Sequence, residues 1–332
     1  MTQRQPPIGS GFTAASTADD ILRGVDLSGT NVVVTGGHGG IGLETTRALS
    51  KAGATVTVGA RNPDRAAAAL AGIARVEVGP LDLLDPASID AFAARYVESG
   101  RPLHILVNNA GIGAGPLVRD ARGYEAQFAT NHLGHFQLTL GLLPALRAAR
   151  GARVVNLTSG GHRLSDIRWD DPHFATGYDA MLAYGQSKTA NVLFAVELDR
   201  LWAHEGIRGY AVHPGIVVST NLSRSVPEDE MRTMNVAMEL IDESGRPIID
   251  PDQEKKTPQQ GASTSVFGAT SPLLAEIGGV YLKDNDISPL DEDPQPIVFG
   301  SRPIVESTVV PHAIDPVSAA RLWDLSEQLL KA

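Results

Sequence analysis

Short apolar segments rich in β-branched residues alternate with segments of helical spacing through the first two-thirds of the chain. The expected strands are residues 31–35, 54–59, 75–78, 103–107, 154–158 and 209–213. The expected helices are residues 41–52, 63–71, 86–99, 124–150 and 183–204. Strands that are apolar almost throughout are buried on both faces, and strands joined by helices pair in parallel.

This alternation predicts an α/β fold, a Rossmann-like, three-layer, doubly wound parallel sheet of about seven strands. The seventh strand is expected at residues 279–282, and amphipathic helices at 261–269 and 316–330. We expect residues 1–332 to form a single domain. Beyond a minimal domain of this kind, the extra residues are expected in an N-terminal extension (1–30), a substrate-lid excursion (222–260) and a C-terminal tail (284–332).

Composition limits the partners that the chain can have. Cysteine is absent, which excludes disulfides and thiolate metal sites. The net charge of −10 disfavours binding to nucleic acid or to an anionic membrane. No apolar run approaches the roughly 18 residues of a membrane span, and the N-terminus lacks the apolar stretch of a signal peptide. We therefore expect a cytoplasmic protein with a small-molecule substrate.

The negative charge is concentrated near the end of the chain. Residues 240–300 contain 11 acidic and 4 basic residues, and this stretch is also rich in proline. Asp284, Asp286 and the acidic run 291–293 lack the spacing of a calcium loop, so a solvated acidic loop is expected. We interpret the stretch as a lid and tail that help to determine the substrate.

A glycine-rich turn separates the first expected strand from the first helix. Residues 35–42 read TGGHGGIG. Glycines permit a tight turn and a close approach of the backbone to a pyrophosphate at a helix N-terminus. The spacing satisfies GxxxGxG, GxxGxxG and GxGxxG alike, so it leaves the class of dinucleotide site open. An ordinary glycine-rich turn is the alternative.

The end of the second strand bears on the choice between NAD and NADP. An NAD site favours Asp or Glu there, on the ribose hydroxyls. This chain has Arg61 and Asn62 after Gly59-Ala60. A guanidinium is suited to a 2′-phosphate, so NADP is favoured over NAD, although Arg61 could also be an ordinary surface residue.

Tyr184 and Lys188 form a YxxxK pattern within an expected helix. Residues four apart share a helix face, so the ammonium would stabilise a phenolate and lower the pKa of Tyr184. A tyrosine of lowered pKa can exchange a proton with a carbonyl or alcohol oxygen. Most YxxxK pairs are simply exposed side chains, so the surrounding motifs decide the interpretation.

Taken with its neighbours, this pattern resembles the short-chain dehydrogenase/reductase family over roughly residues 30–220. The matching motifs, in family order, are TGGHGGIG, Leu81-Asp82-Leu83, Asn108-Asn109-Ala110-Gly111, Asn131-His132-Leu133-Gly134, Ser159, Tyr184 with Lys188, and His213-Pro214-Gly215. The sequence is most similar to the retinol dehydrogenase-like branch, which includes the WW-domain-containing oxidoreductase. The motif at 108–111 favours the dehydrogenases over nucleotide-sugar epimerases and dehydratases.

The resemblance implies four catalytic residues. Tyr184 is the expected general acid in reduction and base in oxidation. Lys188 is expected to hold the nicotinamide ribose, Ser159 to donate a hydrogen bond to the substrate oxygen, and Asn131 to fix a water in a proton relay. From residue type alone, Asn131 would be a helix-surface residue and Ser159 a turn residue. The 25 residues between Ser159 and Tyr184 exceed the usual family spacing, an insertion that the retinol dehydrogenase-like branch shares.

The resemblance also implies a cofactor site. Its expected residues are Gly36, His38, Gly40, Ile41 and Gly42 at the pyrophosphate, Arg61 and Asn62 at the 2′-phosphate, Asp82 and Leu83 at the adenine, Asn109, Ala110 and Gly111 at the adenosine ribose, and Pro214, Gly215 and Thr220 with Tyr184 and Lys188 at the nicotinamide. Thr220 follows Pro214-Gly215 by one residue more than is common, so Ser219 is an alternative there.

The sequence thus predicts an NADP(H)-dependent oxidoreductase that transfers hydride between nicotinamide and an alcohol or carbonyl carbon. Pocket walls are expected from residues 161–181 and 221–260, and their apolar residues predict an apolar substrate: Ile167, Trp169, Phe174, Val226, Met231, Met234, Val236 and Met238. The alternatives are a catalytically silent NADPH-binding regulator and a nucleotide-sugar epimerase or dehydratase.

Two further expectations concern metals and assembly. His132, His135, His162 and His173 are close in sequence, but no cysteine or carboxylate cluster completes a site, so no metal is expected. The family resemblance implies a homodimer or homotetramer formed through the helices at 124–150 and 183–204. Helix amphipathicity cannot distinguish that interface from packing within one chain.

Overall fold

The computed structural model describes residues 5–218, 222, 226–295 and 306–331. One sheet runs through the molecule, and its strands are ordered β3-β2-β1-β4-β5-β6-β7-β8. The strands are β1 (Asn31–Thr35), β2 (Thr55–Ala60), β3 (Val76–Pro80), β4 (Ile105–Asn108), β5 (Ala152–Leu157), β6 (Ile207–His213), β7 (Val280–Lys283) and β8 (Asp286–Ile287). The first seven are parallel and β8 is antiparallel to β7, which confirms the predicted doubly wound sheet.

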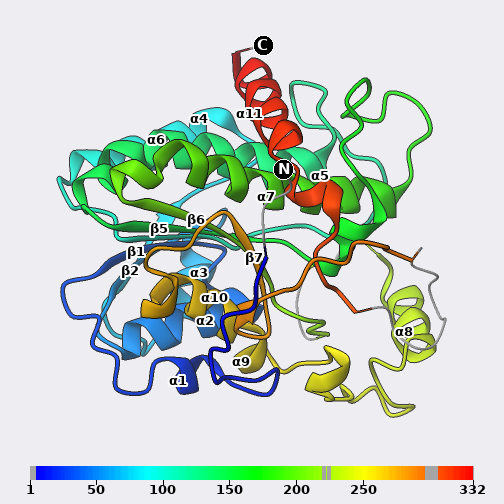
Figure 1. Cartoon of the computed structure of the whole chain (residues 1–332), viewed down its shortest axis with the longest axis horizontal. Helices are drawn as coiled ribbons and strands as arrows, with labels where there is room; N and C mark the ends of the chain where they lie inside the picture. The colour runs from blue at the N-terminus through cyan, green and yellow to red at the C-terminus, as the bar shows by residue number, and fades with distance from the viewer. Residues whose placement is uncertain (1–4, 219–221, 223–225, 296–305, 332) are drawn as a thin grey trace.

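Helices cover both faces of the sheet (Figure 1). On one face lie α4 (Pro86–Glu98), α6 (Gly134–Ala148) and α7 (Ala180–Trp202). On the other lie α1 (Ala18–Ile21), α2 (Gly40–Lys51), α3 (Pro63–Ala69), α9 (Pro258–Gly261) and α10 (Ser263–Thr270). Short 3₁₀ segments are Gly160–Leu164, Ala203–Glu205, Pro251–Gln253, Pro272–Leu274 and Pro311–Ile314.

The central strands are apolar at nearly every position because helices cover both faces of the sheet. Val32, Val33 and Val34 of β1 are all fully buried. Val32 and Val34 belong to the apolar cluster beneath α2 and α10, whereas Val33 belongs to the cluster beneath α4 and α6. Because successive side chains of a strand point to opposite faces, a strand covered on both sides needs apolar residues at every position.

The helix expected at 124–150 is interrupted. The structure has α5 (Ala126–Phe128), a π-helical turn at Ala129–Leu133 and then α6. Asn131 lies in the π-helical turn and is fully buried, so it is not the helix-surface residue that its type alone suggests. A Cβ on Gly134 would lie 2.4 Å from the carbonyl oxygen of Leu83, so only glycine lets α6 begin against the loop after β3. π-helical turns are frequent at functional sites.

Glu292 and Asp293 are exposed, as expected for a solvated acidic loop, but the expectation was wrong for Asp284 and Asp286. The Asp286 carboxylate accepts hydrogen bonds from the backbone N–H groups of Ile8, Gly9 and Ser10, which binds the N-terminal extension to the sheet edge. Asp284 pairs with the buried ammonium of Lys256. Many of these charges therefore hold separate parts of the chain together.

The hairpin between β7 and β8 depends on two residues of positive φ, Asp284 (52°) and Asn285 (66°). Two such central residues match the twist of a two-residue hairpin, and Asp and Asn tolerate this conformation better than most residues. A strand as short as β8 leaves little periodicity in the sequence, which explains why it was not predicted.

The C-terminal helix α11 (Pro316–Lys331) packs on α7 (Figure 1). Trp323 makes edge-to-face contacts with Phe136 of α6 and Trp202 of α7, at centroid distances of 4.9 and 5.3 Å. The helices expected at a subunit interface thus have partners within the chain, since α4 also packs on α6.

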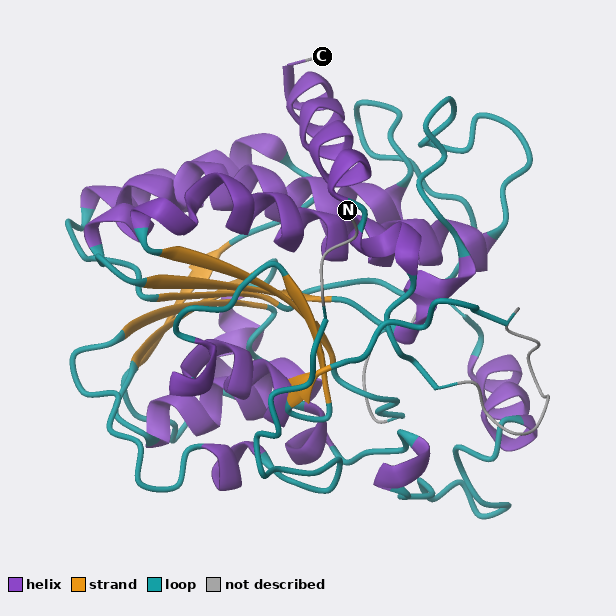
Figure 2. Cartoon of the chain, viewed as in Figure 1, coloured by secondary structure: helices purple, strands orange, loops and turns teal. Residues whose placement is uncertain are grey.

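The helix α8 (Glu228–Ala237) lies apart from these layers (Figure 2, right) and has no buried residue. It belongs to the predicted lid excursion. Among the described residues, no helix combines the length and the apolar character needed to cross a bilayer.

The contacts of Trp323 predict a large effect on stability. We expect Trp323→Ala to lower the free energy of unfolding by about 3–5 kcal/mol, because it removes a large buried ring between three aromatic side chains. Urea denaturation measures the change. Val317→Ala on the same helix is the control, since Val317 is 74% exposed and should change stability by less than about 0.5 kcal/mol. Equal effects of the two changes would show that α11 does not stabilise the core.

Candidate active site

The residues singled out in the sequence lie where strands end. The glycine turn follows β1, Arg61 follows β2, Asn109 follows β4 and Ser159 closely follows β5. Because these strands are parallel, their carboxyl ends meet at one edge of the sheet. β1 lies between β2 and β4, so the direction of the connections changes there. Open α/β sheets bind ligands outside the strands at such a point.

The glycine turn has no room for side chains at the positions that face β4. A Cβ on Gly42 would lie 2.5 Å from Nδ2 of Asn109 and 2.6 Å from the carbonyl oxygen of Gly36. Gly36 itself has a φ of +64°, which favours glycine. No side chain caps α2 at Gly39, so the first N–H groups of this helix lack the usual protein acceptor. His38, Gly40 and Ile41 lie half-buried in the same turn.

A buried hydroxyl connects this turn to the loop after β4. Thr35 Oγ1 accepts hydrogen bonds of 2.9 Å from the backbone N–H groups of both Asn109 and Ala110. Asn109 also donates from Nδ2 to the carbonyl oxygen of Thr35, at 2.8 Å. Gly111 continues the loop toward Asn131 and Lys188: its Cβ would lie 3.2 Å from Asn131 Oδ1 and 3.7 Å from Lys188 Nζ.

The Thr35 hydroxyl also determines the state of His135. Since Thr35 Oγ1 already accepts two N–H groups, its own proton points to Nε2 of His135, at 2.8 Å. Nδ1 of His135 then carries the ring proton and donates to the carbonyl oxygen of Asn131, at 3.0 Å. Burial lowers the pKa of His135 to about 4, which agrees with a neutral ring. Sequence reasoning missed this role, although the spacing of four residues from Asn131 was visible.

Both N–H groups of the Asn131 side chain are engaged, and its oxygen accepts one hydrogen bond. Its Oδ1 accepts from the N–H of Ile112 (2.9 Å), and its Nδ2 donates to the carbonyl oxygen of Ile112 (3.0 Å) and to Ser187 Oγ (2.9 Å). Asn131 therefore joins the loop after β4 to α7, close to the tyrosine and lysine of the YxxxK pattern.

Ser159, Tyr184 and Lys188 are brought together at this edge. Ser159 lies beside Tyr184, since a Cβ on Gly161 would lie 2.8 Å from the Tyr184 ring and 3.5 Å from Ser159 Oγ. Lys188 Nζ lies 5.4 Å from the centroid of the Tyr184 ring and 3.4 Å from the carbonyl oxygen of Leu157, to which it donates. A Cβ on Gly161 would lie 2.8 Å from the Tyr184 ring, so glycine lets this ring approach the loop that carries Ser159.

Two hydrogen bonds hold α7 against the end of β5. Thr158 Oγ1 donates to the carbonyl oxygen of Lys188 (2.7 Å), and Asn191 Nδ2 donates to that of Leu157 (2.9 Å). These two hydrogen bonds fix the position of Lys188 relative to the end of β5. Neither residue carried a signal in the sequence, because a threonine at a strand end and an asparagine in a helix are common.

The electrostatics differ from the expectation for Tyr184. Burial raises the pKa of this phenol, and the hydrogen bond with Ser159 only partly opposes the shift. Burial also lowers the pKa of Lys188 to about 8. The expected lowering of the Tyr184 pKa is therefore not seen in this structure, because the loss of hydration on burial is the largest cause of the shift.

Most of the residues expected around the 2′-phosphate and the adenine also have structural partners. Asn62 Oδ1 accepts from the N–H of Arg65 and caps α3. Asp82 Oδ1 accepts from the N–H of Leu84. Leu83 packs against the start of α6. Arg61 is exposed, and within the described part of the chain no hydrogen bond or ion pair engages its guanidinium.

Pro214 and Gly215 follow β6 and lie near the glycine turn. A Cβ on Gly261 would lie 3.3 Å from Ile41 and 3.5 Å from the carbonyl oxygen of Pro214, so α9 bridges the two loops. Thr220 and the alternative Ser219 lie outside the described residues.

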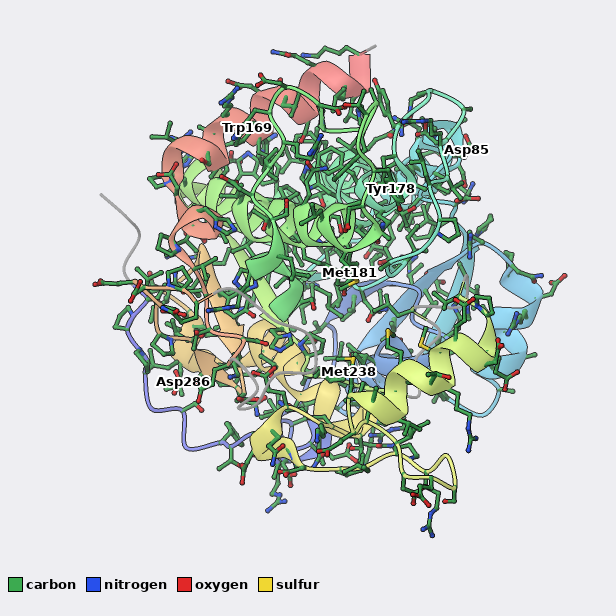
Figure 3. The ribbon with its side chains drawn as sticks, turned by 90° about the vertical axis from the view of Figure 1, so that its right-hand side faces the viewer. Asp85, Trp169, Tyr178, Met181, Met238 and Asp286 are labelled. Atoms are coloured by element: carbon green, nitrogen blue, oxygen red, sulfur yellow. The ribbon has the colours of Figure 1, made fainter. Side chains whose placement is uncertain are left out.

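Three of the residues expected in the substrate pocket have other surroundings. Ile167 and Phe174 are only 4% and 1% exposed and belong to the core. Trp169 lies beside α11 (Figure 3), where the guanidinium of Arg321 covers its ring at 4.3 Å. These apolar residues belong to the packing of the insertion and tail, because that insertion has to cover α5 and α7.

Other apolar residues remain exposed near the lid. Met234 and Val236 of α8 are 46% and 39% exposed, and Leu182 in the first turn of α7 is 38% exposed. In the view of Figure 3, Met181 and Met238 are drawn near the centre of the picture, whereas Trp169 is drawn beside α11 near its top. Among the described residues no cluster of three or more His, Asp or Glu side chains could hold a metal ion.

The comparisons with known proteins agree with this geometry. The family model described as short chain dehydrogenase matches residues 30–231. The chain belongs to the short-chain dehydrogenase family. A "Probable oxidoreductase" of Streptomyces lividans is 44% identical over 93% of this chain and 100% of its own length. This confirms the family that the motifs indicate.

Relatives of the expected branch also match. Mouse retinol dehydrogenase 12 is 38% identical over 78% of this chain and 79% of its own length. The zebrafish WW domain-containing oxidoreductase is 35% identical over 94% of this chain and 71% of its own length. The resemblance to the retinol dehydrogenase-like branch is thereby confirmed.

Solved structures show the same architecture. An uncharacterised protein from Mycobacterium paratuberculosis has a TM-score of 0.70 and 31% identity, over 96% of this chain and 98% of its own. The Pseudomonas aeruginosa RhlG/NADP active-site complex has a TM-score of 0.58 and 26% identity, over 77% of this chain and 95% of its own.

The buried histidines predict sensitivity to acid. Burial lowers the pKa of His135 to about 4 and that of His132 to about 3 in the folded chain, against about 6.5 in the unfolded chain. The unfolded state therefore binds more protons between pH 6.5 and 4, and stability falls as the pH drops through this window. At pH 5 each such histidine costs on the order of 1–2 kcal/mol relative to pH 8.

Urea denaturation between pH 5 and 8 tests this. His135→Gln should show a shallower loss of stability with falling pH than the wild type. His204→Gln is the control, because the His204 side chain is 75% exposed. A wild-type slope in His135→Gln would contradict the prediction.

Proposed function

We propose that the chain is an NADP(H)-dependent oxidoreductase that transfers hydride between nicotinamide and an alcohol or carbonyl carbon. The observation that carries the proposal is the convergence of Ser159, Tyr184 and Lys188 at the sheet edge, beside the loop that Asn131 holds. A tyrosine hydroxyl and a serine hydroxyl that lie side by side can both face one substrate oxygen, an arrangement suited to acid–base catalysis at a carbonyl.

The residues present fit a dinucleotide. The glycine turn allows a close backbone approach, and the first N–H groups of α2 lack a side-chain cap. Gly36, His38, Gly40, Ile41 and Gly42 would hold the pyrophosphate, Asp82 and Leu83 the adenine, Asn109, Ala110 and Gly111 the adenosine ribose, and Lys188, Pro214, Gly215 and Thr220 the nicotinamide end. When bound, the reduced cofactor supplies the hydride.

In reduction, the proposed roles follow from the contacts. Tyr184 donates its proton to the substrate oxygen, and Ser159 donates a hydrogen bond to the same oxygen. Lys188, buried at the end of β5, places a positive charge near the phenolate that forms. This charge favours the proton transfer, since it stabilises the product state of Tyr184 more than the reactant state. Asn131 keeps the loop after β4 in register with α7 and is proposed to hold a water of the proton relay.

The preference for NADP rests on Arg61. Its guanidinium directly follows β2, beside the glycine turn, and the described residues leave it exposed. A phosphate would find there a charge-assisted donor without a competing carboxylate of NAD type. The similarity to a structure that holds NADP supports the same choice.

The substrate is proposed to be apolar. Apolar surface is exposed or half-buried on α8 and at the start of α7. It belongs to Met231, Met234, Val236 and Leu182. Methionine side chains adapt to ligands of irregular shape. The residues between Val226 and Met238 belong to the excursion that follows the loop after β6, and we propose that they lie on the nicotinamide side of the site.

We also propose that the extensions and the core form one domain. Asp286 binds the N-terminal extension, and α11 packs on α7. Because α11 covers α7 within the chain, a dimer through the long helices would have to form around α11 or beside it.

Replacing the tyrosine tests the reaction. Tyr184→Phe should lower kcat by about 10²–10⁴-fold, because no other group there can donate the proton as well, while NADPH binding stays within about two-fold. A panel of aldehydes and ketones with NADPH absorbance measures kcat, and protein fluorescence measures binding. Tyr96→Phe is the control, since Tyr96 is a buried tyrosine of α4 outside the site.

If wild type and Tyr184→Phe both bind NADPH and are equally slow on every substrate, the chain is a cofactor-binding regulator and the enzymatic proposal fails. Conversion of a nucleotide sugar without net change in NADPH would instead support the epimerase alternative.

Replacing the arginine tests the cofactor. Arg61→Ala should weaken NADPH binding by about 10–100-fold and leave NADH binding nearly unchanged, because only NADPH carries the 2′-phosphate. Titration calorimetry with both cofactors measures this. Arg65→Ala, one turn into α3 and also exposed, is the matched control. Equal losses for the two cofactors in Arg61→Ala would contradict the assignment.

A further inference from the structure

Glu254 lies in the acidic lid excursion, yet it is only 6% exposed. Its carboxylate is surrounded by donors from three distant segments. Lys283 Nζ, at the end of β7, lies 2.8 Å from Oε1. Ser307 in the C-terminal tail donates its N–H to Oε1 (2.9 Å) and its hydroxyl to Oε2 (2.7 Å). Although burial opposes ionisation, the hydrogen bond of His213 and the charge of Lys283 hold the pKa of Glu254 well below its usual range.

The third partner of Glu254 is His213, the last residue of β6. The backbone N–H of Gly160 donates to Nδ1 of His213, at 3.2 Å, so this nitrogen carries no proton. The ring proton is therefore on Nε2, which donates to Oε2 of Glu254, at 3.1 Å. A carboxylate cannot donate a hydrogen bond, so it favours the Nε2–H tautomer, the one that leaves Nδ1 free to accept from Gly160.

Gly160 follows Ser159 directly. A Cβ on Gly160 would lie 2.1 Å from the hydroxyl of Ser307, so the tail packs tightly on the residue next to the serine. The Ser159 hydroxyl accepts a hydrogen bond from the N–H of Gly161, at 3.1 Å. The position of the Ser159 hydroxyl thus depends on a short loop that His213 holds on one side and the tail covers on the other.

The backbone of Glu254 holds the next loop. Its carbonyl oxygen accepts from the N–H of Ile216, at 2.7 Å, and a Cβ on Gly215 would lie 2.8 Å from this oxygen. Glu254 has a positive φ of 63°, a conformation that is uncommon for glutamate. The backbone of Glu254 therefore contacts the loop after β6, and its side chain reaches the loop after β5 through His213.

We propose that Glu254 is a positioning residue of the active site: through the Nε2–H tautomer of His213 it fixes the Gly160 amide, and with it the Ser159 hydroxyl. The inference rests on the proposed oxidoreductase function. It gives the acidic, proline-rich excursion a role in the chemistry as well as in covering the substrate. Removing the carboxylate should displace Ser159 from the substrate oxygen, and small displacements at a reacting centre lower kcat strongly.

Two substitutions of His213 separate this role from simple packing. In His213→Asn the side-chain oxygen is bonded to Cγ, as Nδ1 is, so it can still accept from Gly160. In His213→Gln the polar atoms lie one bond further out, as Nε2 does, so they can reach Glu254 but not Gly160. We expect His213→Asn to keep kcat within about three-fold of wild type. His213→Gln and Glu254→Gln should lower kcat about ten-fold or more, with the Kd for NADPH changed less than two-fold.

Asp199→Asn is the matched control. Asp199 is also buried and pairs with Arg208 and the N–H of Gly209, but at the opposite end of β6. It should cost stability without lowering kcat. If Asp199→Asn and Glu254→Gln lower kcat equally, or if His213→Asn is as slow as His213→Gln, the positioning role is wrong.

A readout that does not use turnover keeps this inference separate from the proposed function. Nitrogen-15 NMR of the imidazole distinguishes a protonated ring nitrogen from an unprotonated one. We expect His213 to be protonated at Nε2 alone in the wild type and to show a mixture of tautomers in Glu254→Gln. The same single tautomer in both proteins would overturn the proposal. A wild type with this tautomer but without activity on any substrate would refute only the oxidoreductase function.

Discussion

The site depends on one buried hydroxyl at the end of β1. Thr35 Oγ1 accepts the N–H groups of Asn109 and Ala110 and donates to His135, which in turn donates to the carbonyl oxygen of Asn131. The orientation follows from counting protons: a hydroxyl that accepts twice has only one proton to give, and a neutral imidazole that accepts on one nitrogen must donate from the other. This chain connects the glycine turn to the π-helical turn, and so the cofactor side of the proposed site to its catalytic side.

A second hydrogen-bond network holds the loop after β5, which carries Ser159. Glu254, His213 and the Gly160 amide connect the lid excursion and the tail to the loop that carries Ser159. Buried charges are costly unless they are paired and hydrogen-bonded, and here Lys283 and Ser307 complete the coordination of Glu254. The acidic residues of this region are thus divided: Asp229 and Glu230 of α8 face solvent, whereas Glu254 contributes to the interior.

Much of the fold could be predicted because its signals are local. Three consecutive buried valines in β1, the glycines after it and the proline that opens α4 each reflect constraints on nearby residues. The interruption at Ala129–Leu133 could not be predicted, because its surroundings include distant residues: Gly134, directly after it, packs against Leu83, 51 residues earlier in the chain. The surroundings of Trp169 and Phe174 could not be predicted either, because an aromatic residue is equally suited to a substrate wall and to a core. Only the positions of α11 and of the insertion decide between the two.

The sequence by itself determined the parallel sheet, the order of the motifs and the family, because the spacing of apolar residues and glycines is governed by strand and helix periods. It also indicated the side chains that we propose for the chemistry of the reaction. Only the tertiary structure decided how those side chains are held. The tautomers of His135 and His213, the burial of Glu254 and the raised pKa of Tyr184 all arise from groups far apart in the chain that share one water-poor volume, where each proton and each charge needs a partner.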